Sequence, residues 1–370
     1  MKLKLKNTPE QVELIKAMGS KNAIAAREAQ EAFAAFLGPV VQQVLNQAGT
    51  ANGIYTDAAY DEDDSPSFPL DLYYNNGDNH VSVWSQSVAG GLPSSHVAGM
   101  NELKIATYRL DSAINMLKKY VRRARLDVVS KGIERMAQEI LVKQERNAWA
   151  VLLKALAEGS TGGTGHMVTS ASNGTSNLFF TLDDLNALMT RIRRINESFA
   201  NGTPDVAYSN GLTDLYMSPE RMQDVRAMAY QPMNTRNPAG GTATATHDGI
   251  ALPDNVRSDI YNSAGANEIY GVRLNELNEL GPSKKYTKLF NVYSSYNSFA
   301  DSDDLVVGLD NSKGAFIRPV ATQSETGGQV VTLADDQWSA RSDKVGFYAA
   351  VEEGRVCIDA RAVVGIHIDT

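Results

Sequence analysis

A helical pattern at residues 126–158 constrains the fold more than any other feature of the chain. Large apolar residues recur at steps of three and four, which is the spacing of one face of an α-helix, at Leu126, Val129, Ile133, Met136 and Ile140. Trp149, Leu152 and Leu156 continue the stripe. At 1.5 Å per residue such a helix is roughly 45–50 Å long, well above the usual length in globular domains. We therefore expect a spine helix that ends at the Gly- and Ser-rich stretch 158–165.

A second amphipathic pattern covers residues 20–47, upstream of the spine. Its apolar residues keep a spacing of mostly three and four, and they are Ile24, Phe33, Phe36, Leu37, Val40, Val41, Val44 and Leu45. Proline lacks a backbone donor, so we expect the helix to break once, at Gly38-Pro39. The pattern predicts an arm that lies on another surface.

Residues 49–99 change character and become rich in Gly, Pro, Asn, Asp and aromatic residues. Asn76-Gly77 supplies the turn residues for a β-hairpin within 70–84. About fifty residues without a helix are long for a loop, so we expect this segment to be functional or to pack on another molecule. The acidic stretch 57–66 lacks the glycine of an EF-hand, and we favour a solvated loop over a loose cation site.

The chain beyond residue 166 alternates helices and short strands, which predicts an α+β fold. Thr181 and Asp184 form the capping-box pattern of a helix, and Ser218 followed by Pro219 opens another. Short strands are expected within 204–211, 214–218, 267–281, 303–310 and 314–320, and the closing run 344–368 is expected to be extended.

Composition excludes several classes of protein. The formal net charge of −8 and the pI of about 5.3 argue against a protein that coats DNA through a basic face. A single cysteine, Cys357, excludes an internal disulfide framework and fits a reducing cytoplasm. No window approaches the ~20 apolar residues of a membrane span, so we expect neither secretion nor membrane insertion.

The sequence contains residue types that can act in catalysis or bind metals, but not at the spacing of a known catalytic or metal site. His80, His96, His166, His247 and His367 have no second ligand at zinc-site spacing, so we expect neither a metal nor a cofactor. The stretch 158–165 lacks the ending of a phosphate loop, and the alternation around Cys357 predicts an inert thiol. A hydrolase that uses the loop at Ser94 to His96 remains an alternative, although no GxSxG elbow is present.

The strongest positive patch is Lys118, Lys119, Arg122, Arg123 and Arg125. It could contact DNA or an acidic neighbouring subunit, and the sequence leaves both options open. The arm, the hairpin, the oversized helix and the terminal β-structure are parts that one chain cannot bury by itself. Such parts predict a homo-oligomer and no enzyme.

The order of these parts resembles the major capsid proteins of tailed phages, which have the Hong Kong 97-type fold. Segments 215–230, 267–281, 303–320 and 344–368 look like major head proteins of the T-even-related and cyanophage kind. The resemblance covers most of the chain from about residue 50. It implies a structural protein that self-assembles into an icosahedral head around double-stranded DNA. It places the protein in the virion after assembly in the host cytoplasm.

The resemblance also implies a layout and a set of partners. The N-terminal arm would span 1–50, the extended loop 51–105, the peripheral domain 106–165 with 330–361, and the axial domain 166–329 with 362–370. Partners would be further copies in hexameric and pentameric capsomers, a scaffold, a portal and a decoration protein. The DNA would be enclosed without specific binding, and no membrane would be involved.

Subunit contacts are expected in the extended loop and in the basic patch. Some members of this family cross-link through a lysine of the extended loop, but this chain has no Lys between Lys21 and Lys104. The resemblance therefore implies a non-covalent shell held by Phe68, Tyr73, Tyr74, Val83 and Trp84. The alternative is an encapsulin, in which the same fold encloses a cargo enzyme.

Overall fold

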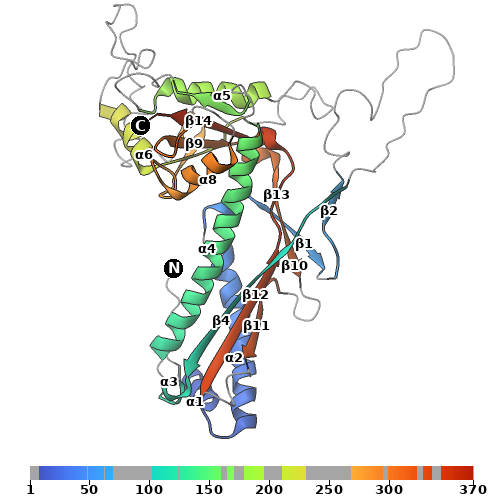
Figure 1. The fold of residues 1–370 in the computed structure, drawn as a ribbon. Helices are drawn as coiled ribbons and strands as arrows, with labels where there is room; N and C mark the ends of the chain where they lie inside the picture. The colour runs from blue at the N-terminus through green and yellow to red at the C-terminus, as the bar shows by residue number, and fades with distance from the viewer. Residues whose placement is uncertain are drawn as a thin grey trace, which may run out of the picture. The chain divides into compact units, whose positions relative to one another are not determined.

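Two six-stranded sheets organise the chain, one in each of two units. The computed structural model describes residues 8–47, 49–61, 63–69, 102–123, 126–159, 165–170, 179–195, 211–230, 268–294, 299–322, 328–335 and 343–369. The first unit comprises Met1–Phe68, Leu103–Ala148 and Phe316–Val356, and the second comprises Pro69–Glu102, Trp149–Ala315 and Cys357–Thr370. The fold is therefore mixed α/β, with both units built from distant stretches of the sequence (Figure 1).

The elements follow one another in this order. The helices are α1 (Pro9–Met18), α2 (Ala23–Gln47), α3 (Lys118–Arg122), α4 (Leu126–Gly159), α5 (Leu182–Ile195), α6 (Pro219–Tyr230) and α8 (Lys285–Tyr293). The strands are β1 (Thr56–Asp61), β2 (Ser67–Pro69), β3 (Glu102–Lys104), β4 (Tyr108–Leu117), β5 (Met167–Thr169), β6 (Asp214–Met217), β7 (Glu268–Ile269), β8 (Val272–Glu276), β9 (Asp304–Leu309), β10 (Phe316–Thr322), β11 (Val331–Asp335), β12 (Lys344–Glu353), β13 (Val356–Cys357) and β14 (Val363–Ile368). None of the helices in the described part of the chain is long and apolar enough to cross a membrane.

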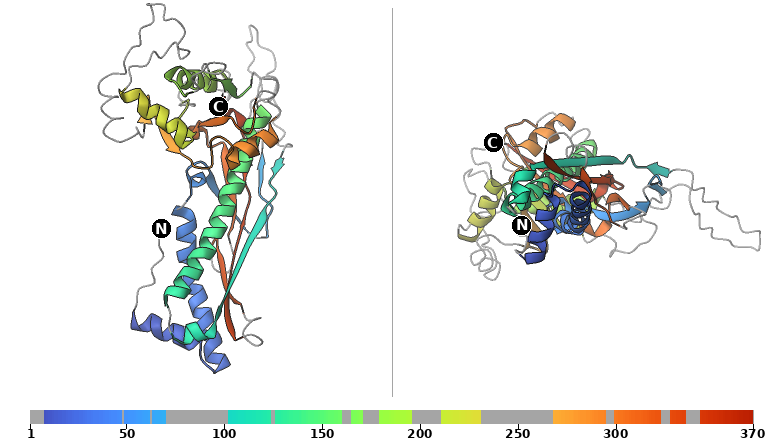
Figure 2. Two further views of the ribbon diagram at one scale, coloured as in Figure 1. Left: turned by 60° about the vertical axis from the view of Figure 1, so that its left-hand side comes forward. Right: turned by 90° about the horizontal axis from the view of Figure 1, so that it is seen from below.

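The sheet of the first unit is built around β12. This strand pairs antiparallel with β4 along all ten residues and with β11 along five. At its end, Glu353 pairs with Val320 of β10, and β10 in turn pairs parallel with β1. Helices α2 and α4 lie against this sheet (Figures 1 and 2), and residues of both helices share one hydrophobic core with β12. Phe33 of α2 meets Phe347 of β12 with ring centroids 5.3 Å apart.

Helix α4 confirms the predicted spine almost to the residue. Of the predicted stripe, Val129, Ile133, Met136 and Ile140 are buried in the core of the first unit, and Trp149, Leu152 and Leu156 are buried in the second. The first four of these residues are apolar because they pack in a core with α2 and β12. The long spacing pattern was a sufficient signal for the element.

The predicted break in the first helix is wrong, because α2 runs through Pro39 to Gln47. Pro39 has no N–H to donate to the Ala35 carbonyl, so one hydrogen bond of the helix is missing there. One residue earlier, the Thr332 hydroxyl of β11 donates a hydrogen bond of 2.7 Å to the Ala34 carbonyl. A Cβ on Gly38 would lie 3.1 Å from that hydroxyl oxygen, so the glycine permits this close approach. The helix is therefore in contact with β11 close to the proline.

Two strands of the first unit differ from the expectation. The acidic stretch was expected to be a solvated loop, but residues Thr56–Asp61 form β1 and pair with β10. Strand β4 was not predicted at all, although its residues alternate between exposed and more buried from Tyr108 to Leu117. That alternation is the period-two signal of a strand, and it was available in the sequence.

The sheet of the second unit has the order β5-β14-β9-β6-β8-β7 and mixes parallel and antiparallel pairs. Helices α5 and α6 pack on one face, where they meet Leu215, Val306 and Ile366. The opposite face holds Trp149, which stacks on Tyr286 of α8 and meets Tyr216 of β6 edge-on. Each strand therefore has a buried residue on both sides, which explains why β6, β9 and β14 are buried throughout.

Both predicted helix starts of the second unit are confirmed. The Thr181 hydroxyl oxygen accepts from the Asp184 amide at 3.2 Å, and the Asp184 carboxylate accepts from the Thr181 amide at 2.9 Å. At the start of α6, the Ser218 hydroxyl oxygen accepts from the Arg221 amide at 3.3 Å. Each short strand expected within 214–218, 267–281, 303–310 and 314–320 is also present. The predicted hairpin within 70–84 lies outside the described residues, as does the strand within 204–211 except for Gly211.

Candidate functional site

A buried carboxylate is the centre of the polar interactions in the first unit. Glu353 at the end of β12 is fully buried. It accepts from Arg318 Nε at 2.8 Å, from Arg355 Nη2 at 3.2 Å and from Gln144 Nε2 at 3.1 Å. The Tyr108 hydroxyl donates to its other oxygen at 3.0 Å. Four elements of the sequence thus meet at one side chain, and its two arginines make it a charged anchor of the unit.

The surroundings of this anchor are aromatic. The Arg355 guanidinium lies over the Tyr55 ring, 4.7 Å from its centroid, and the Tyr55 hydroxyl donates to the Ala148 carbonyl at 2.8 Å. Burial, with the Glu353 carboxylate as the next cause, raises the pKa of Tyr108 to about 12. A neutral phenol beside an ion pair holds structure together. It offers no group that is poised to react at neutral pH.

The second unit has its own buried carboxylate, Asp304 at the start of β9. It accepts from the Ser218 hydroxyl at 2.6 Å and from Arg221 Nε at 2.9 Å. Arg221 also pairs with Asp224 at 2.9 Å, and Asp224 accepts from the Phe180 amide at 2.9 Å. Burial raises the pKa of both carboxyl groups. This network ties the start of α6 to the sheet, and it too is structural.

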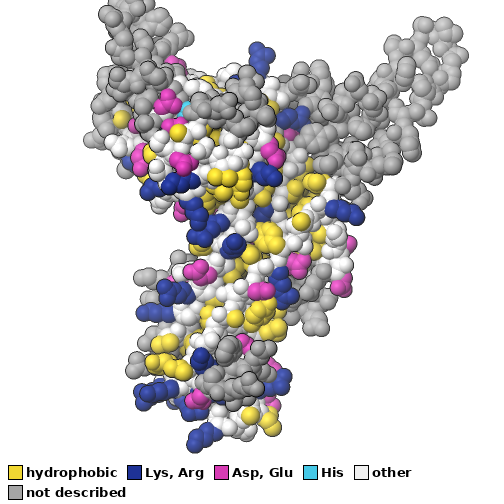
Figure 3. Space-filling model, viewed as in Figure 1, with side chains coloured by type: hydrophobic (Ala, Val, Ile, Leu, Met, Phe, Trp, Pro, Cys, Tyr) yellow, Lys and Arg dark blue, Asp and Glu magenta, His cyan; other side chains and the backbone are white. Residues whose placement is uncertain are grey.

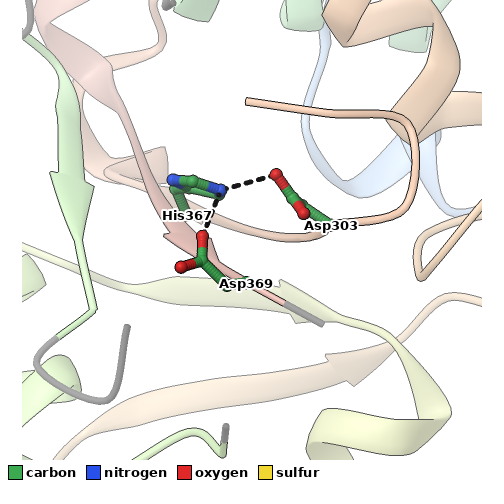
Figure 4. Close-up of side chains that lie close together, drawn as sticks. All are labelled: Asp303, His367 and Asp369. Carbon is green, nitrogen blue, oxygen red and sulfur yellow. Dashed lines mark hydrogen bonds and ion pairs between the residues drawn. The ribbon is translucent and has the colours of Figure 1, made fainter. Parts of the chain in front are cut away.

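Three ionisable side chains meet at one end of the second sheet. His367 Nε2 lies 2.8 Å from Asp303 Oδ2 and 3.1 Å from Asp369 Oδ1 (Figure 4). The sequence offered a partial signal, because His367 and Asp369 are two apart at the end of a strand and so share a face. Asp303 is distant in the sequence, and only the register of β9 against β14 brings it close.

The thiol of Cys357 is the only one in the sequence. Burial, with the nearby Asp359 as the next cause, raises its pKa to about 12. Because the thiolate is the nucleophile, a thiol with this pKa is almost entirely unreactive at neutral pH. This supports the expectation of an inert structural cysteine.

The structure places four of the five residues of the basic patch at one end of the first unit. Lys118, Lys119 and Arg122 lie in α3, and Arg123 follows directly; Arg125 lies outside the described residues. Arg122 has its partners within the first unit: its Nε donates to the Gly19 carbonyl at 2.7 Å, and its Nη2 lies 3.5 Å from Asp343. Lys119 and Arg123 are exposed and extend the positive charge outward.

Of the contact residues expected in the extended loop, only Phe68 lies in the described part of the chain. It is half-buried in β2, which pairs with β3 in a two-stranded sheet. Tyr73, Tyr74, Val83 and Trp84 lie outside the described residues, as do Ser94, Ser95 and His96 of the hydrolase alternative. The contact role of these residues stays a prediction.

Large apolar side chains are exposed on several elements, and two of them belong to the apolar face of the predicted arm. Ile24 and Phe36 of α2 are 71% and 48% exposed. On the face shown in Figure 3, hydrophobic side chains lie in patches among Lys and Arg side chains along α4. The other exposed large apolar residues of the first unit are Leu117, Tyr120, Val128, Val142 and Leu333. Exposed apolar surface of this kind is typical of protein–protein contact.

The chain is similar to known proteins in its fold but matches none of those compared by sequence. No family model and no curated protein matches the sequence. The capsid of Cyanophage P-SCSP1u aligns over 86% of this chain and 88% of its own, with a TM-score of 0.52 at 14% identity. Capsids of the empty and native GTA particle align over 87% of this chain and 90% and 91% of theirs, each with a TM-score of 0.50 at 12% identity. The chain therefore has the fold of these capsid proteins.

Proposed function

We propose that this chain is the major capsid protein of a tailed bacteriophage, a structural subunit that self-assembles into the shell around double-stranded DNA. The observation that carries the proposal is the alignment of nearly nine-tenths of the chain with capsid subunits of similar length. Because the alignment spans both units, it concerns the whole subunit and not one common motif. A shared fold can serve several functions, so the argument also needs surface features that suit a shell.

The surfaces of the first unit suit a subunit that is covered by its neighbours. Exposed Ile24 and Phe36 on one helix would each lose contact with water in an assembly, at roughly 25 cal/mol per Å² of apolar surface buried. Lys119 and Arg123 carry positive charge on a chain whose net charge is −8. An acidic neighbouring copy is the partner we propose for this patch.

At finer detail, we propose the Hong Kong 97-type arrangement of this fold. Residues 1–50 would be the N-terminal arm and 51–105 the extended loop, with Phe68, Tyr73, Tyr74, Val83 and Trp84 as non-covalent contacts. The peripheral domain would comprise 106–165 and 330–361, and the axial domain 166–329 and 362–370. The continuous helix α4 supports a spine in this arrangement, and β12 and β14 supply closing strands to two different sheets.

The partners in this proposal are further copies of the chain in hexameric and pentameric capsomers, with a scaffold, a portal and a decoration protein. The subunit has no catalytic role and belongs to the virion after assembly in the host cytoplasm. DNA would be enclosed without specific binding. A net charge of −8 suits that role, because tight binding to phosphates would hinder packaging and release.

The test is the mass and shape of the purified chain, measured by light scattering and negative-stain microscopy with and without a co-expressed scaffold. We expect capsomers, tubes or closed polyhedral shells. Small uniform cages that carry one enzyme would instead establish an encapsulin. A monomer under every condition would refute the shell. Hydrolytic turnover lost on Ser95→Ala or His96→Ala would favour the hydrolase.

A further inference from the structure

The cluster of Asp303, His367 and Asp369 follows from the register of two neighbouring strands. Strands β9 and β14 are antiparallel, and Ile368 lies opposite Asp304. The next positions outward are therefore Asp369 and Asp303, which face each other across the strands. His367 lies two residues before Asp369 and points to the same face. Three side chains of one sheet face thus converge at its end, and their ligand atoms lie within 4.8 Å of one another.

Two carboxylates converge on one imidazole nitrogen in this cluster. Like charges directly opposite each other on neighbouring strands destabilise a sheet. Here both carboxylates also point at one atom, His367 Nε2 (Figure 4). The side chains of His367 and Asp303 are 1% and 9% exposed, so water screens their charges poorly. A divalent cation bound between these ligand atoms would neutralise both carboxylate charges.

The distances fit ligands that share one ion. Metal bonds of about 2.1 Å place adjacent ligand atoms about 3.0–3.4 Å apart. His367 Nε2 lies 3.1 Å from Asp369 Oδ1, within that range, and 2.8 Å from Asp303 Oδ2, a hydrogen-bond distance just below it. One imidazole nitrogen with two carboxylate oxygens is a donor set that Zn²⁺ accepts. Ca²⁺ and Mg²⁺ prefer sites built from oxygen alone.

The three side chains are held in place by their surroundings. His367 lies on β14, which is flanked by β5 and β9, and its ring packs against Phe299 with centroids 5.2 Å apart. The Asp303 carboxylate accepts from the Ala300 amide at 2.7 Å. Asp369 is 41% exposed, so one side of the cluster is open to solvent. Two ligands are thus fixed before an ion arrives, and the third lies where an ion would enter.

We propose that Asp303, His367 and Asp369 bind one Zn²⁺ ion or a similar first-row divalent cation. Nε2 of the histidine and one oxygen of each carboxylate are the ligands, and water completes the coordination. The ion would fasten the end of β14 to the segment before β9. This proposal concerns the second unit alone and does not depend on the shell function, since it can be tested on the unassembled chain.

The test begins with the full chain freed of metal by a chelator and titrated with ZnCl2 in a calorimeter. We expect one Zn²⁺ per chain and a higher thermal unfolding temperature with the ion than with chelator. Asp369→Asn removes a ligand at the half-exposed position, where folding is least at risk. We expect it to weaken Zn²⁺ binding by about tenfold or more, as loss of supporting partners already does at known sites. Asp303→Asn should have the same effect.

The matched control is Asp301→Asn, which removes an equal charge from the same segment. Asp301 is exposed and accepts from Asn291 Nδ2 at 2.8 Å, outside the cluster. We expect this variant to bind Zn²⁺ like the unchanged chain. Absence of binding by the unchanged chain would overturn the proposal, and so would equal binding by Asp369→Asn. In that case the His367 ring contacts the carboxylates without a metal ion between them. Tighter binding of CaCl2 than of ZnCl2 would overturn the assignment of the ion.

Discussion

At the scale of single residues, Glu353 pairs with two buried guanidinium groups, of which that of Arg318 also lies 3.4 Å from Asp57. Replacing it with glutamine keeps the shape but removes the charge that faces Arg318 and Arg355. Breaking a buried ion pair by removing one partner costs about 3–5 kcal/mol. We therefore expect Glu353→Gln to lower the free energy of unfolding of the first unit by about this amount, measured by denaturation in urea.

The control for that experiment is the neighbouring carboxylate. Glu352 accepts from the neutral hydroxyls of Tyr60 and Thr107, at 3.2 and 3.1 Å. Its replacement by glutamine keeps an acceptor for both, so we expect a loss of about 1 kcal/mol or less. Equal losses for the two variants would contradict the role of Glu353 as the charged anchor.

Because of Tyr108, we expect the stability of the first unit to fall as the pH becomes alkaline. Its folded pKa of about 12 exceeds the ordinary value of 10.0, because burial and Glu353 disfavour the phenolate. The unfolded chain therefore loses this proton first, and the contribution of Tyr108 to stability is full below pH 10 and is lost as the pH rises through 12. Tyr108→Phe removes the titration. We expect the stability difference between the two chains to shrink by about 2 kcal/mol over this range.

This expectation is checked by urea unfolding at several pH values and by the ultraviolet absorbance of tyrosinate. The difference between the two chains isolates Tyr108, because every other group titrates in both. A stability difference that stays constant from about pH 9 to about pH 12 would contradict it.

At the scale of elements, helix α2 depends on one hydroxyl of the sheet. Thr332→Val keeps the shape of the side chain but leaves the Ala34 carbonyl without its hydroxyl donor in the turn before Pro39. We expect a loss of about 1 kcal/mol in unfolding free energy. Thr332→Ser retains the hydroxyl and serves as the control. A serine variant as unstable as the valine variant would show that packing of the methyl group, and not the hydrogen bond, is responsible.

The elements also show what the sequence could reveal. Helices α4, α5 and α6 were predictable because periodicity and capping residues are local signals. The continuation of α2 through Pro39 was not, since proline is a local signal for a break and the packing of α2 on β11 and β12 depends on residues far along the chain. Strand β1 was not predicted, because its acidic residues are typical of a loop and its pairing partner β10 is distant in the sequence. The cluster at His367 was predictable only in part: Asp369 is two residues away in the sequence, whereas the position of Asp303 depends on the strand register.

At the scale of the whole molecule, the shell proposal predicts that some surface residues matter only in the assembly. Ile24→Ser and Phe36→Ser together remove two exposed apolar side chains of α2. Substitutions at such positions usually change the unfolding free energy by less than about 0.5 kcal/mol per residue. We expect the double variant to fold as a subunit but to give far fewer shells, counted by electron microscopy and light scattering.

Glu28→Gln is the matched control, because Glu28 is an exposed polar residue of the same helix. It should assemble like the unchanged chain. Normal assembly of the double variant would show that this side of α2 faces no neighbouring copy. The proposal would then have to place its contacts on other surfaces.

The pairing of β12 and β14 with earlier strands has a consequence for folding. Strand β12 lies between β4 and β11, and β14 lies between β5 and β9. Neither sheet is complete until residues 344–368 have been synthesised. Early strands such as β4 must wait for partners that are distant in sequence, which slows folding. A chain that stops before residue 344 lacks both inner strands, so we expect it to complete neither sheet.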